Sequence, residues 1–414
     1  MKSKKFLAIA LILIAALVSF TACSSSSTTT SDSTSYAGQG TAVEGTTIKI
    51  GVFQPTTGEN GGGGYLEVLG TRYANEMYKT VTIDGVEYTI ELVEVDNQSD
   101  KTAAVTAAQN LISSGVVAVA GSYGSGVCIA AGQTFLDAVV PAVACSATNP
   151  QVTLGNDMYF RMCFLDPFQG TVGANYAAEE GMLKAATIAQ NGDDYSTGLV
   201  AYFTDAYTAL GGEIVSAQTY QTNESDFKAI LTAIKEADPD VIYCPSSVQT
   251  APLVMQQARA LGIDAVFIGT DTWDNQIIVD TAGADAEGMI FTTMFDENDT
   301  ENAVAVEFVQ GYKAWVNADA DRLVHNGNSD QASAMCALGY DAYMAIYNAL
   351  ASLDGQGLET ITSGDIREAL VSVEFDGVTG AMAFDENGDA IKDTAYIKTV
   401  EDGAFKFLKT QVAK

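Results

Sequence analysis

Short apolar runs alternate with segments of helical spacing from Thr47 onward, and this rhythm constrains the fold more than any other feature of the sequence. In the first block it predicts strand 48–53, helix 65–78, strand 88–95, helix 99–114 capped by Ser99, strand 116–120, helix 127–138 and strand 141–144. Strands that alternate with helices are joined by crossovers, so the block predicts a parallel sheet covered by helices on both faces.

The same rhythm recurs in a second block. Its expected strands are 185–189, 213–217, 241–244, 265–269 and 288–293, and its expected helices are 196–210, 226–237 capped by Ser225, and 250–261. The helices that follow, 303–316, 331–353 and one from Ser363, have no strands between them, and a strand-rich segment runs from 375 to 408. These late segments must complete lobes that are already formed.

We therefore expect an α/β fold of two Rossmann-like lobes with parallel-core sheets, joined by a multi-strand hinge. Lobe 1 is assigned to residues 47–164 and 297–375, and lobe 2 to residues 165–296 and 376–414. A hinge of several chain crossings allows the lobes to close around a cleft.

The N-terminus has the pattern of a signal peptide over residues 1–22. Lysines precede an apolar run from Phe6 to Val18 that is too short to span a membrane. The residues up to Cys23 resemble a bacterial lipoprotein box, which implies lipidation of Cys23; an uncleaved membrane anchor is the alternative. Residues 23–46 are rich in Ser and Thr and are expected to form a flexible tether. The protein is thus expected outside the cytoplasm, lipid-anchored to the bacterial cell membrane.

Composition excludes several kinds of chemistry. A formal charge of −32 disfavours nucleic-acid binding. The five cysteines after Cys23 lack metal-site spacing, and we interpret them as core thiols, with pairing of two of them left open. The single histidine, His325, has no second histidine or nearby nucleophile and is expected at the surface. We therefore expect no metal, no cofactor and no histidine-based catalysis.

Small polar residues follow two neighbouring strands of the first block, at 121–126 and 144–150. The carboxyl ends of parallel strands form the usual ligand crevice, and a helix start there favours an anion. Ordinary βα turns are the alternative. In the second block, Asp271 ends a strand beside Trp273, which favours an ammonium site; a helix N-cap is the alternative.

Two other stretches carry weaker signals. The glycines 61–64 stand where a dinucleotide fingerprint would lie, but neither phosphate-binding motif is complete, so we expect a flexible lip or a close backbone approach. Residues 385–389 lack the spacing of a calcium loop and are interpreted as a hairpin turn. Neither stretch predicts a cofactor.

From about residue 47 to the C-terminus the chain resembles type I periplasmic binding proteins, in particular the leucine/isoleucine/valine receptors of branched-chain amino-acid ABC transporters. The resemblance is carried by Ile48 to Gly51 with Gly58, Gly121 to Ser125, Ser146 to Pro150, Arg161 with Gln169-Gly170, Tyr195 with Gly198, Gln257 to Arg259 with Gly262, Gly269 to Trp273, and Gly377 to Gly380 with Phe384-Asp385. These motifs occur in the family's order and spacing.

The resemblance implies a set of ligand contacts. The α-carboxylate site falls on Ser125 and Thr148 with the backbone of Ser146 and Ala147. The α-ammonium site falls on the Ser146 carbonyl and on Asp271, where the family carries Glu. Further ligand-binding positions implied or expected are Tyr195 and Ser247 of lobe 2, Tyr65 of lobe 1, and Trp273.

The resulting hypothesis is a receptor that captures an amino acid, branched-chain or otherwise small and apolar, and delivers it to an ABC transporter permease as a monomer. An amide, urea or another small ligand is the alternative within the same fold, as is a sensory module. A hydrolase would need a nucleophile with its base, and the chain has no G-x-S-x-G elbow. We therefore expect no catalysed reaction.

Overall fold

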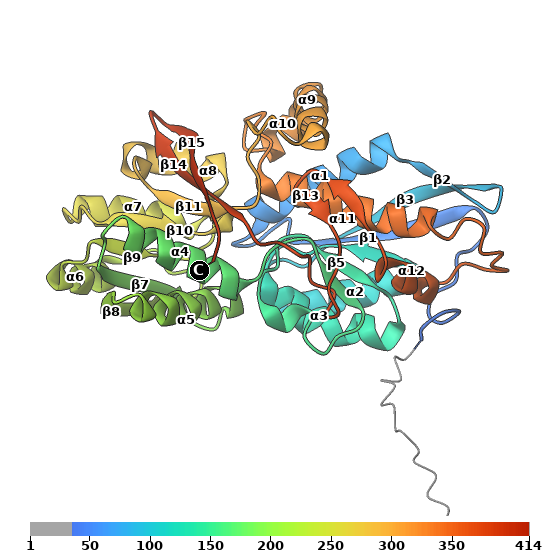
Figure 1. The fold of residues 1–414 in the computed structure, drawn as a ribbon, viewed down its shortest axis with the longest axis horizontal. Helices are drawn as coiled ribbons and strands as arrows, with labels where there is room; N and C mark the ends of the chain where they lie inside the picture. Colours follow the sequence, from blue (N-terminus) through green and yellow to red (C-terminus); the bar gives the residue numbers. More distant parts are fainter. Residues whose placement is uncertain (1–34, 414) are drawn as a thin grey trace, which may run out of the picture. The chain divides into compact units, whose positions relative to one another are not determined.

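The first sheet is built around β1 (Thr47–Gln54), which lies between β3 and β4 in the computed structural model of residues 35–413 (Figure 1). The order of its strands is β2 (Thr80–Ile83), β3 (Val86–Asp96), β1, β4 (Ala118–Ala120), β5 (Ala142–Ala144) and β6 (Tyr159–Arg161). Neighbouring strands are parallel except in the β2–β3 pair. The carboxyl ends of β1, β4 and β5 therefore meet at one edge.

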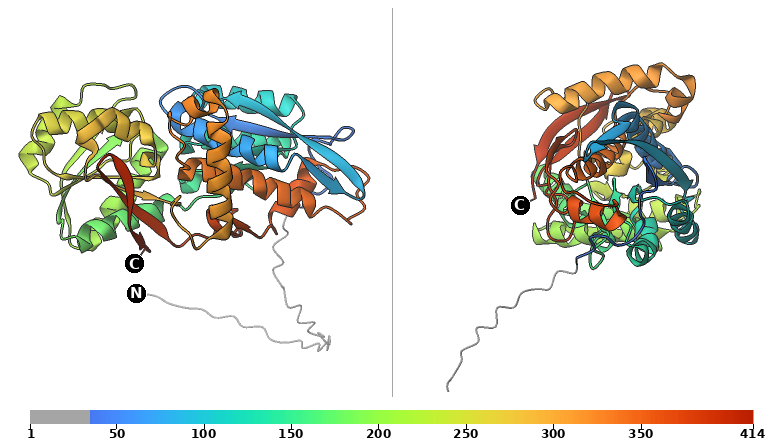
Figure 2. Two further views of the ribbon diagram at one scale, coloured as in Figure 1. Left: turned by 90° about the horizontal axis from the view of Figure 1, so that it is seen from above. Right: turned by 90° about the vertical axis from the view of Figure 1, so that its right-hand side faces the viewer.

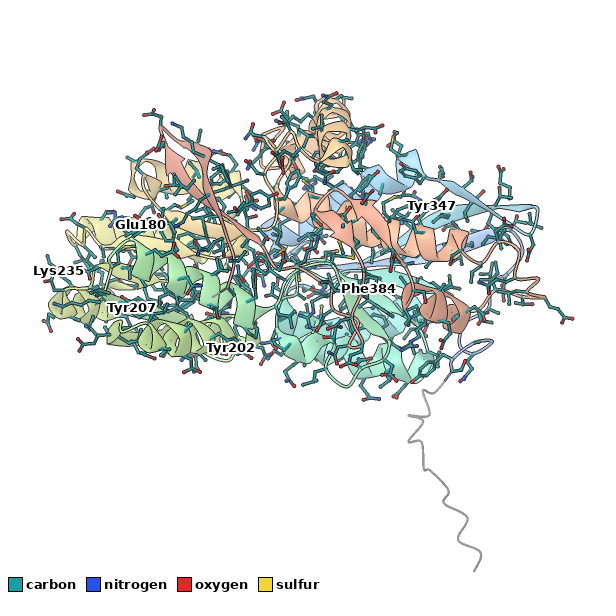
Figure 3. All side chains as sticks on the ribbon, viewed as in Figure 1. Glu180, Tyr202, Tyr207, Lys235, Tyr347 and Phe384 are labelled. Atoms are coloured by element: carbon teal, nitrogen blue, oxygen red, sulfur yellow. The ribbon has the colours of Figure 1, made fainter. Side chains whose placement is uncertain are left out.

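Helices in pairs cover the first sheet. Helix α1 (Gly61–Met77) packs on α11 (Ala334–Ala351), and α2 (Lys101–Ser113) packs on α3 (Ser125–Ala138). Glycines let α1 and α11 approach closely, because a Cβ at Gly70 would collide with the backbone of α11. The Tyr347 hydroxyl of α11 donates to the Thr80 carbonyl of β2 at 3.3 Å, which ties the helix to the sheet edge (Figure 3).

The second sheet has a parallel core and two antiparallel edge strands. Its order is β15 (Ala404–Gln411), β14 (Ala395–Glu401), β11 (Ile290–Thr293), β10 (Val266–Gly269), β9 (Val241–Tyr243), β7 (Lys184–Gln190) and β8 (Glu213–Tyr220). Around it lie α4 (Asp166–Glu179), α5 (Asp194–Ala209), α6 (Lys228–Ala237), α7 (Thr250–Ala260) and α8 (Gln276–Ala282) (Figure 1). The predicted α/β fold with two parallel-core sheets is confirmed.

The chain crosses between the two sheets along neighbouring paths. It passes from β6 to α4, returns from β11 to α9 (Ala303–Asn317), and crosses again after β13 (Gly380–Met382) to reach β14. A β-bridge between Arg161 and Asp389 joins the first and last of these paths. The remaining elements are α10 (Ala320–His325), α12 (Ser363–Leu370), β12 (Phe375–Gly377) and the 3-10 helices η1 (Pro150–Val152), η2 (Asp271–Trp273) and η3 (Gly283–Ala286). Helices α9 and α10 lie beside α1 (Figures 1 and 2).

Several local expectations need correction. The glycines 61–64 form the first turn of α1 rather than a flexible lip, whereas the alternative of a close backbone approach is confirmed, because a Cβ at Gly64 would collide with the Pro55 carbonyl oxygen. Asp100, not Ser99, caps α2, because its side chain accepts the N–H groups of Thr102 and Ala103. Ser225 caps no helix, since α6 begins after Phe227 without a side-chain cap.

Part of the expected tether packs on lobe 1. The Tyr36 N–H donates to the Glu368 carboxylate at 2.8 Å, and the Thr41 N–H donates to the Ser363 hydroxyl at 2.8 Å. Backbone groups of the tether thus find partners on α12, which its Ser- and Thr-rich composition did not indicate. The predicted signal peptide and Cys23 lie outside the described residues.

The cysteines of the described segment, Cys128, Cys145, Cys163, Cys244 and Cys336, are all buried and unpaired, as expected of core thiols. Within residues 35–413, no helix is long and apolar enough to cross a membrane.

Candidate functional site

A small cavity lies where the carboxyl ends of the two sheets face each other. The first lobe contributes loops after β1, β4 and β5, and the second contributes loops after β7, β9 and β10. The residues that line it are Glu59, Asn60, Tyr123, Gly124 and Ser146 from lobe 1, and Gln190, Asp193, Tyr195, Ser247, Asp271 and Thr272 from lobe 2. Of the predicted positions, Ser146, Tyr195, Ser247 and Asp271 therefore meet at one cavity.

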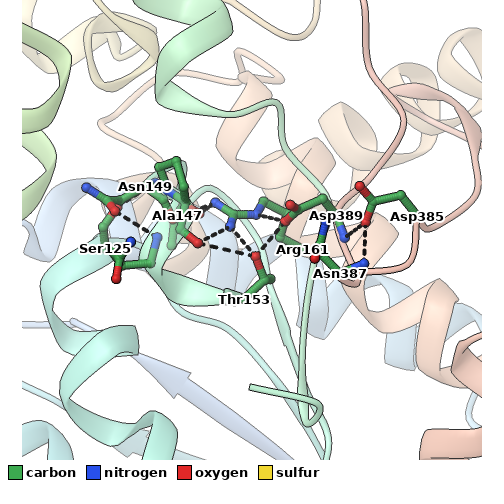
Figure 4. Close-up of polar contacts among 10 residues, drawn as sticks. Ser125, Ala147, Asn149, Thr153, Arg161, Asp385, Asn387 and Asp389 are labelled. Atoms are coloured by element: carbon green, nitrogen blue, oxygen red, sulfur yellow. Dashed lines mark hydrogen bonds and ion pairs between the residues drawn. The ribbon is translucent and has the colours of Figure 1, made fainter. Parts of the chain in front are cut away.

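Arg161 of β6 holds the loop after β5 from behind. Its fully buried guanidinium pairs with Asp389 and donates to the carbonyls of Ala147 and Asn149 at 2.9 and 2.8 Å (Figure 4). It also donates to the Thr153 hydroxyl at 2.6 Å. Since Asp389 comes from the last crossing, this network fixes the loop to the hinge.

Helix α3 begins at the cavity wall. Gly124 lines the cavity and precedes the helix with a φ of 92°, a conformation that side-chain-bearing residues rarely adopt. No side chain of the described chain caps this helix, so the N–H groups of its first turn are available to an anion. The Ser125 hydroxyl accepts the Asn149 N–H at 3.2 Å and retains its own proton to donate. This end of the cavity suits a carboxylate.

Asp271 supplies a carboxylate to the opposite wall. Its Oδ1 accepts from the Gln169 amide at 2.8 Å and from the Tyr195 hydroxyl at 2.7 Å, whereas Oδ2 has no hydrogen-bond partner among residues 35–413. Only 1% of the residue is exposed, and burial raises its pKa to about 6. The helix N-cap alternative does not apply, because no side chain caps η2. An unpaired, buried carboxylate oxygen at a cavity wall is a site for a cationic group.

A second buried carboxylate lies behind Ser146. Glu67 of α1 is fully buried, and the Ser146 hydroxyl donates to its Oε1. Burial raises the pKa of Glu67 to about 8, so the group is mainly protonated at neutral pH. Glu67 therefore positions Ser146 without adding a full negative charge to the cavity.

Thr148 lies beneath the cavity wall and does not line it. Its Oγ1 forms no hydrogen bond within the described chain, and neither carboxylate oxygen of Asp166 does. Asp166 is fully buried, and this burial raises its pKa well above the usual range. Ala147 is also buried, and its carbonyl accepts from Arg161. The predicted carboxylate contacts of Thr148 and Ala147 stay predictions.

Polar contacts join the lobes around the cavity. Lys101 Nζ lies 2.7 Å from Asp194 Oδ2, and the Asn149 amide donates to the Asp194 carbonyl at 2.9 Å. The Gln190 amide donates to Glu59 Oε1 at 2.9 Å. These contacts link loops of the two lobes, so the structure represents a closed conformation of the cavity.

Two predicted positions lie elsewhere. The Tyr65 ring stacks on His325 with centroids 3.8 Å apart, in a separate surface cavity beside α10. Tyr65 is two residues from Gly63, about 200° around the helix, so the two positions face opposite sides. The Trp273 indole is fully buried against Gly269 and donates to the Ser246 hydroxyl at 3.3 Å; it does not line the cavity. His325, expected at the surface, is half-buried through its stacking on Tyr65.

Five residues at or behind the cavity were not predicted as site residues from the sequence: Glu59, Tyr123, Gln190, Asp193 and Glu67. Gln190 is the last residue of β7, so strand-end position could have identified it. Asp193 is the N-cap of α5 and accepts the Ser196 N–H at 2.9 Å, a role that its place before the helix indicates. Glu67 stands between apolar residues on α1, and such a charge on a buried face is a signal that we did not use.

No group of three or more acidic, His or Cys side chains within the described residues has the arrangement of a metal site. Burial of the thiols raises the pKa of Cys145 and Cys163 well above the usual value, which makes them poor nucleophiles. The arrangement is suited to binding a small zwitterion.

Comparisons with known proteins agree with this arrangement. The family model described as periplasmic binding protein matches residues 47–404. A leucine-, isoleucine-, valine-, threonine- and alanine-binding protein of Pseudomonas aeruginosa is 27% identical and covers 83% of this chain and 87% of its own. A leucine binding protein from Thermotoga maritima has a TM-score of 0.78 at 31% identity, over 88% of this chain and 99% of its own. The branched-chain amino acid transporter substrate binding protein of Streptococcus pneumoniae, solved with isoleucine, has a TM-score of 0.77 at 32% identity, over the same shares.

Proposed function

Because the chain belongs to the periplasmic binding protein family, we propose that it captures a free amino acid between its lobes and delivers it to an ABC importer. Members of this family are extracytoplasmic solute-binding receptors. The names of the similar proteins, which include leucine, isoleucine and valine binding, support an amino acid as ligand, and the resemblance by itself implies a branched-chain or other small apolar one.

One observation carries the proposal. The uncapped start of α3 and the unpartnered Oδ2 of Asp271 belong to different lobes and adjoin the same cavity. An α-carboxylate at the helix start would gain the N–H groups of its first turn, and an α-ammonium would gain the free carboxylate oxygen. An amide or a neutral urea would leave one of these two groups without its charged partner.

The remaining parts of the proposal concern location and action. The receptor acts as a monomer, is attached through lipid on Cys23, hands its ligand to a membrane permease and catalyses no reaction. Charged groups facing the cavity are placed to bind rather than to activate a nucleophile, because the chain's single histidine lies at α10 beside Tyr65.

Calorimetric titration of the ligand-free protein with the twenty L-amino acids tests the proposal. We expect one or a few to bind, and we expect the carboxamide of the best ligand to bind at least tenfold more weakly. Ser125→Ala should weaken binding of the acid more than of its amide, whereas Ser113→Ala at the exposed end of α2 should change neither. Equal affinity for the acid and its amide would contradict a carboxylate site.

Small-angle scattering gives an independent readout of closure. The lobes meet through few polar contacts around the cavity, so the ligand-free protein should open at the hinge. We expect a smaller radius of gyration with saturating ligand. A radius that does not change at saturation would argue for a rigid pocket.

A further inference from the structure

Among residues 35–413, no aliphatic side chain of Val, Leu, Ile or Met lines the cavity. Its lining consists of carboxylates, amides, hydroxyls and a glycine, together with the rings of Tyr123 and Tyr195. An isoleucine or leucine side chain placed there would have only these two rings as apolar partners. The cavity is therefore suited to a polar side chain.

Two acidic side chains from different lobes line this cavity besides Asp271. Glu59 comes from the loop before α1, and Asp193 comes from the loop before α5. Gln190 bonds to the first of these side chains. Its amide donates to Glu59 Oε1 and Oε2 at 2.9 and 3.1 Å, and its own Oε1 accepts from the Tyr220 hydroxyl at 3.1 Å. The amide of Gln190 thus donates to Glu59 and, at 3.2 Å, to the Thr222 hydroxyl, and it makes no hydrogen bond to the Asp193 side chain within the described residues.

No basic side chain lines this cavity in the described structure. Lys101 lines the adjoining surface cavity, which Glu59 and Asp193 also line, and there it pairs with Asp194 at 2.7 Å and donates to the Gly192 carbonyl at 3.3 Å. Burial raises the pKa of Glu59, and burial together with the charge of Glu59 raises the pKa of Asp193 to about 6. The charge of Glu59 therefore disfavours the charged form of Asp193, whereas the nearby Lys101 favours it from the adjoining cavity.

Tyr123 gives a second, independent sign of a missing polar partner. The residue is 3% exposed, its hydroxyl has no hydrogen-bond partner among residues 35–413, and it lines the cavity. Its ring lies over Gly63 of α1, where a Cβ would come within 2.6 Å of the ring. Tyr123 thus fills the space that a side chain at position 63 would take, with an oxygen able to accept from a ligand.

We propose that the side-chain end of this cavity binds a cation, so that the ligand is an amino acid with a basic side chain, such as lysine, ornithine or arginine. This inference rests on the proposed function, because the α-ammonium and α-carboxylate are held as described above. The side-chain cation lies between the carboxylates of Glu59 and Asp193, with the Tyr123 hydroxyl as acceptor. The rings of Tyr123 and Tyr195 cover its aliphatic stem.

The charge balance favours this ligand over a neutral one. An α-amino acid clamped at Asp271 leaves the half-buried Glu59 and Asp193 facing the cavity without a cation inside it, and an apolar side chain placed there would remove part of their water. A side-chain ammonium or guanidinium pairs with both carboxylates and replaces the water that they lose on closure. The preference for a basic over an apolar side chain should therefore depend mainly on the carboxylates of Glu59 and Asp193.

Titration calorimetry with L-lysine and L-norleucine tests the proposal, because norleucine has the same stem without the ammonium. We expect wild-type protein to bind lysine at least tenfold tighter than norleucine or leucine. Glu59→Gln and Asp193→Asn should each reduce the lysine-to-norleucine ratio at least fivefold, since both amides keep the hydrogen bond or the helix cap but lose the charge. Asp205→Asn, an exposed position of α5, should leave the ratio unchanged.

The outcomes separate this inference from the proposed function. Binding of leucine or norleucine as tight as binding of lysine overturns the cationic preference and leaves amino-acid capture intact. A lysine preference that survives in both Glu59→Gln and Asp193→Asn overturns the assignment to these carboxylates. Absence of binding to any of the twenty amino acids overturns the proposed function and the inference together.

Discussion

Replacing Asp271 by Asn separates its role in binding from any role in folding. The carboxylate is 1% exposed, and burial raises its pKa from 3.8 to about 6. A shift of that size corresponds to about 3 kcal/mol by which the ligand-free site disfavours the charged form. Asparagine keeps the shape and the two hydrogen bonds at Oδ1, from Gln169 and Tyr195, but not the charge.

The expected losses follow from the unpartnered oxygen. In the variant, an N–H group or an uncharged oxygen takes the place of Oδ2 and faces the ligand ammonium. Removing one partner of a buried charged pair costs roughly 2–5 kcal/mol of binding free energy. At about 1.4 kcal/mol per decade, affinity should fall roughly 30- to 4,000-fold.

Calorimetric titration and thermal unfolding of the ligand-free protein check these expectations together. Stability of the variant at pH 7 should be equal to or higher than that of the wild type, because a buried charge is removed. Asp280→Asn, an exposed position of α8, is the matched control and should change neither measurement. An affinity within threefold of the wild type would refute the role of Asp271 in holding an ammonium.

Three further results are expected. Below about pH 6 the wild-type affinity should fall by up to tenfold per pH unit, because Asp271 must lose a proton to hold an ammonium, and titrations at pH 5 and 7 measure this. The pKa of Glu67 is raised from 4.5 to about 8, so its protonation stabilises the folded state at low pH, and this stabilisation is lost as the pH rises between these two values. Glu67→Gln should therefore flatten this part of the dependence of the melting temperature on pH, measured between pH 5 and 8. An unchanged dependence would contradict the raised pKa of Glu67. Lys101→Ala should weaken ligand binding by less than tenfold, because the Lys101–Asp194 ion pair is partly exposed. The difference in affinity between variant and wild type should disappear at 1 M salt, which screens such a pair. A difference that persists at 1 M salt would show that loss of the ion pair is not its cause.

The sequence by itself determined the α/β class, the two lobes and the strand ends that carry the site. The spacing of apolar residues and the positions of turn residues indicate where each strand ends, and in a parallel sheet the carboxyl ends of the strands meet at one edge. Ser146, Tyr195 and Asp271 could therefore be predicted from their places after β5, β7 and β10.

Only the tertiary structure decided which face of each element meets the cavity. The glycines before Tyr65 gave no helical period, so the rotation of α1 could not be derived, and the structure turns Gly63 and Glu67 inward and Tyr65 outward. The burial of Glu67 could not be predicted from the sequence either, because an acidic residue in so acidic a chain is usually exposed to solvent. In the structure, Glu67 is enclosed by packing between α1, α11 and the loop after β5.

Pairing across the lobes was also decided by the fold. Glu59 and Asp193 are more than a hundred residues apart and lie in different lobes, so no local pattern could place both at one cavity. Their approach depends on the hinge geometry and on Gln190, which links the two loops. Local sequence specifies elements through short-range sterics and hydrogen bonding, whereas the composition of an interlobe cavity is set by long-range packing.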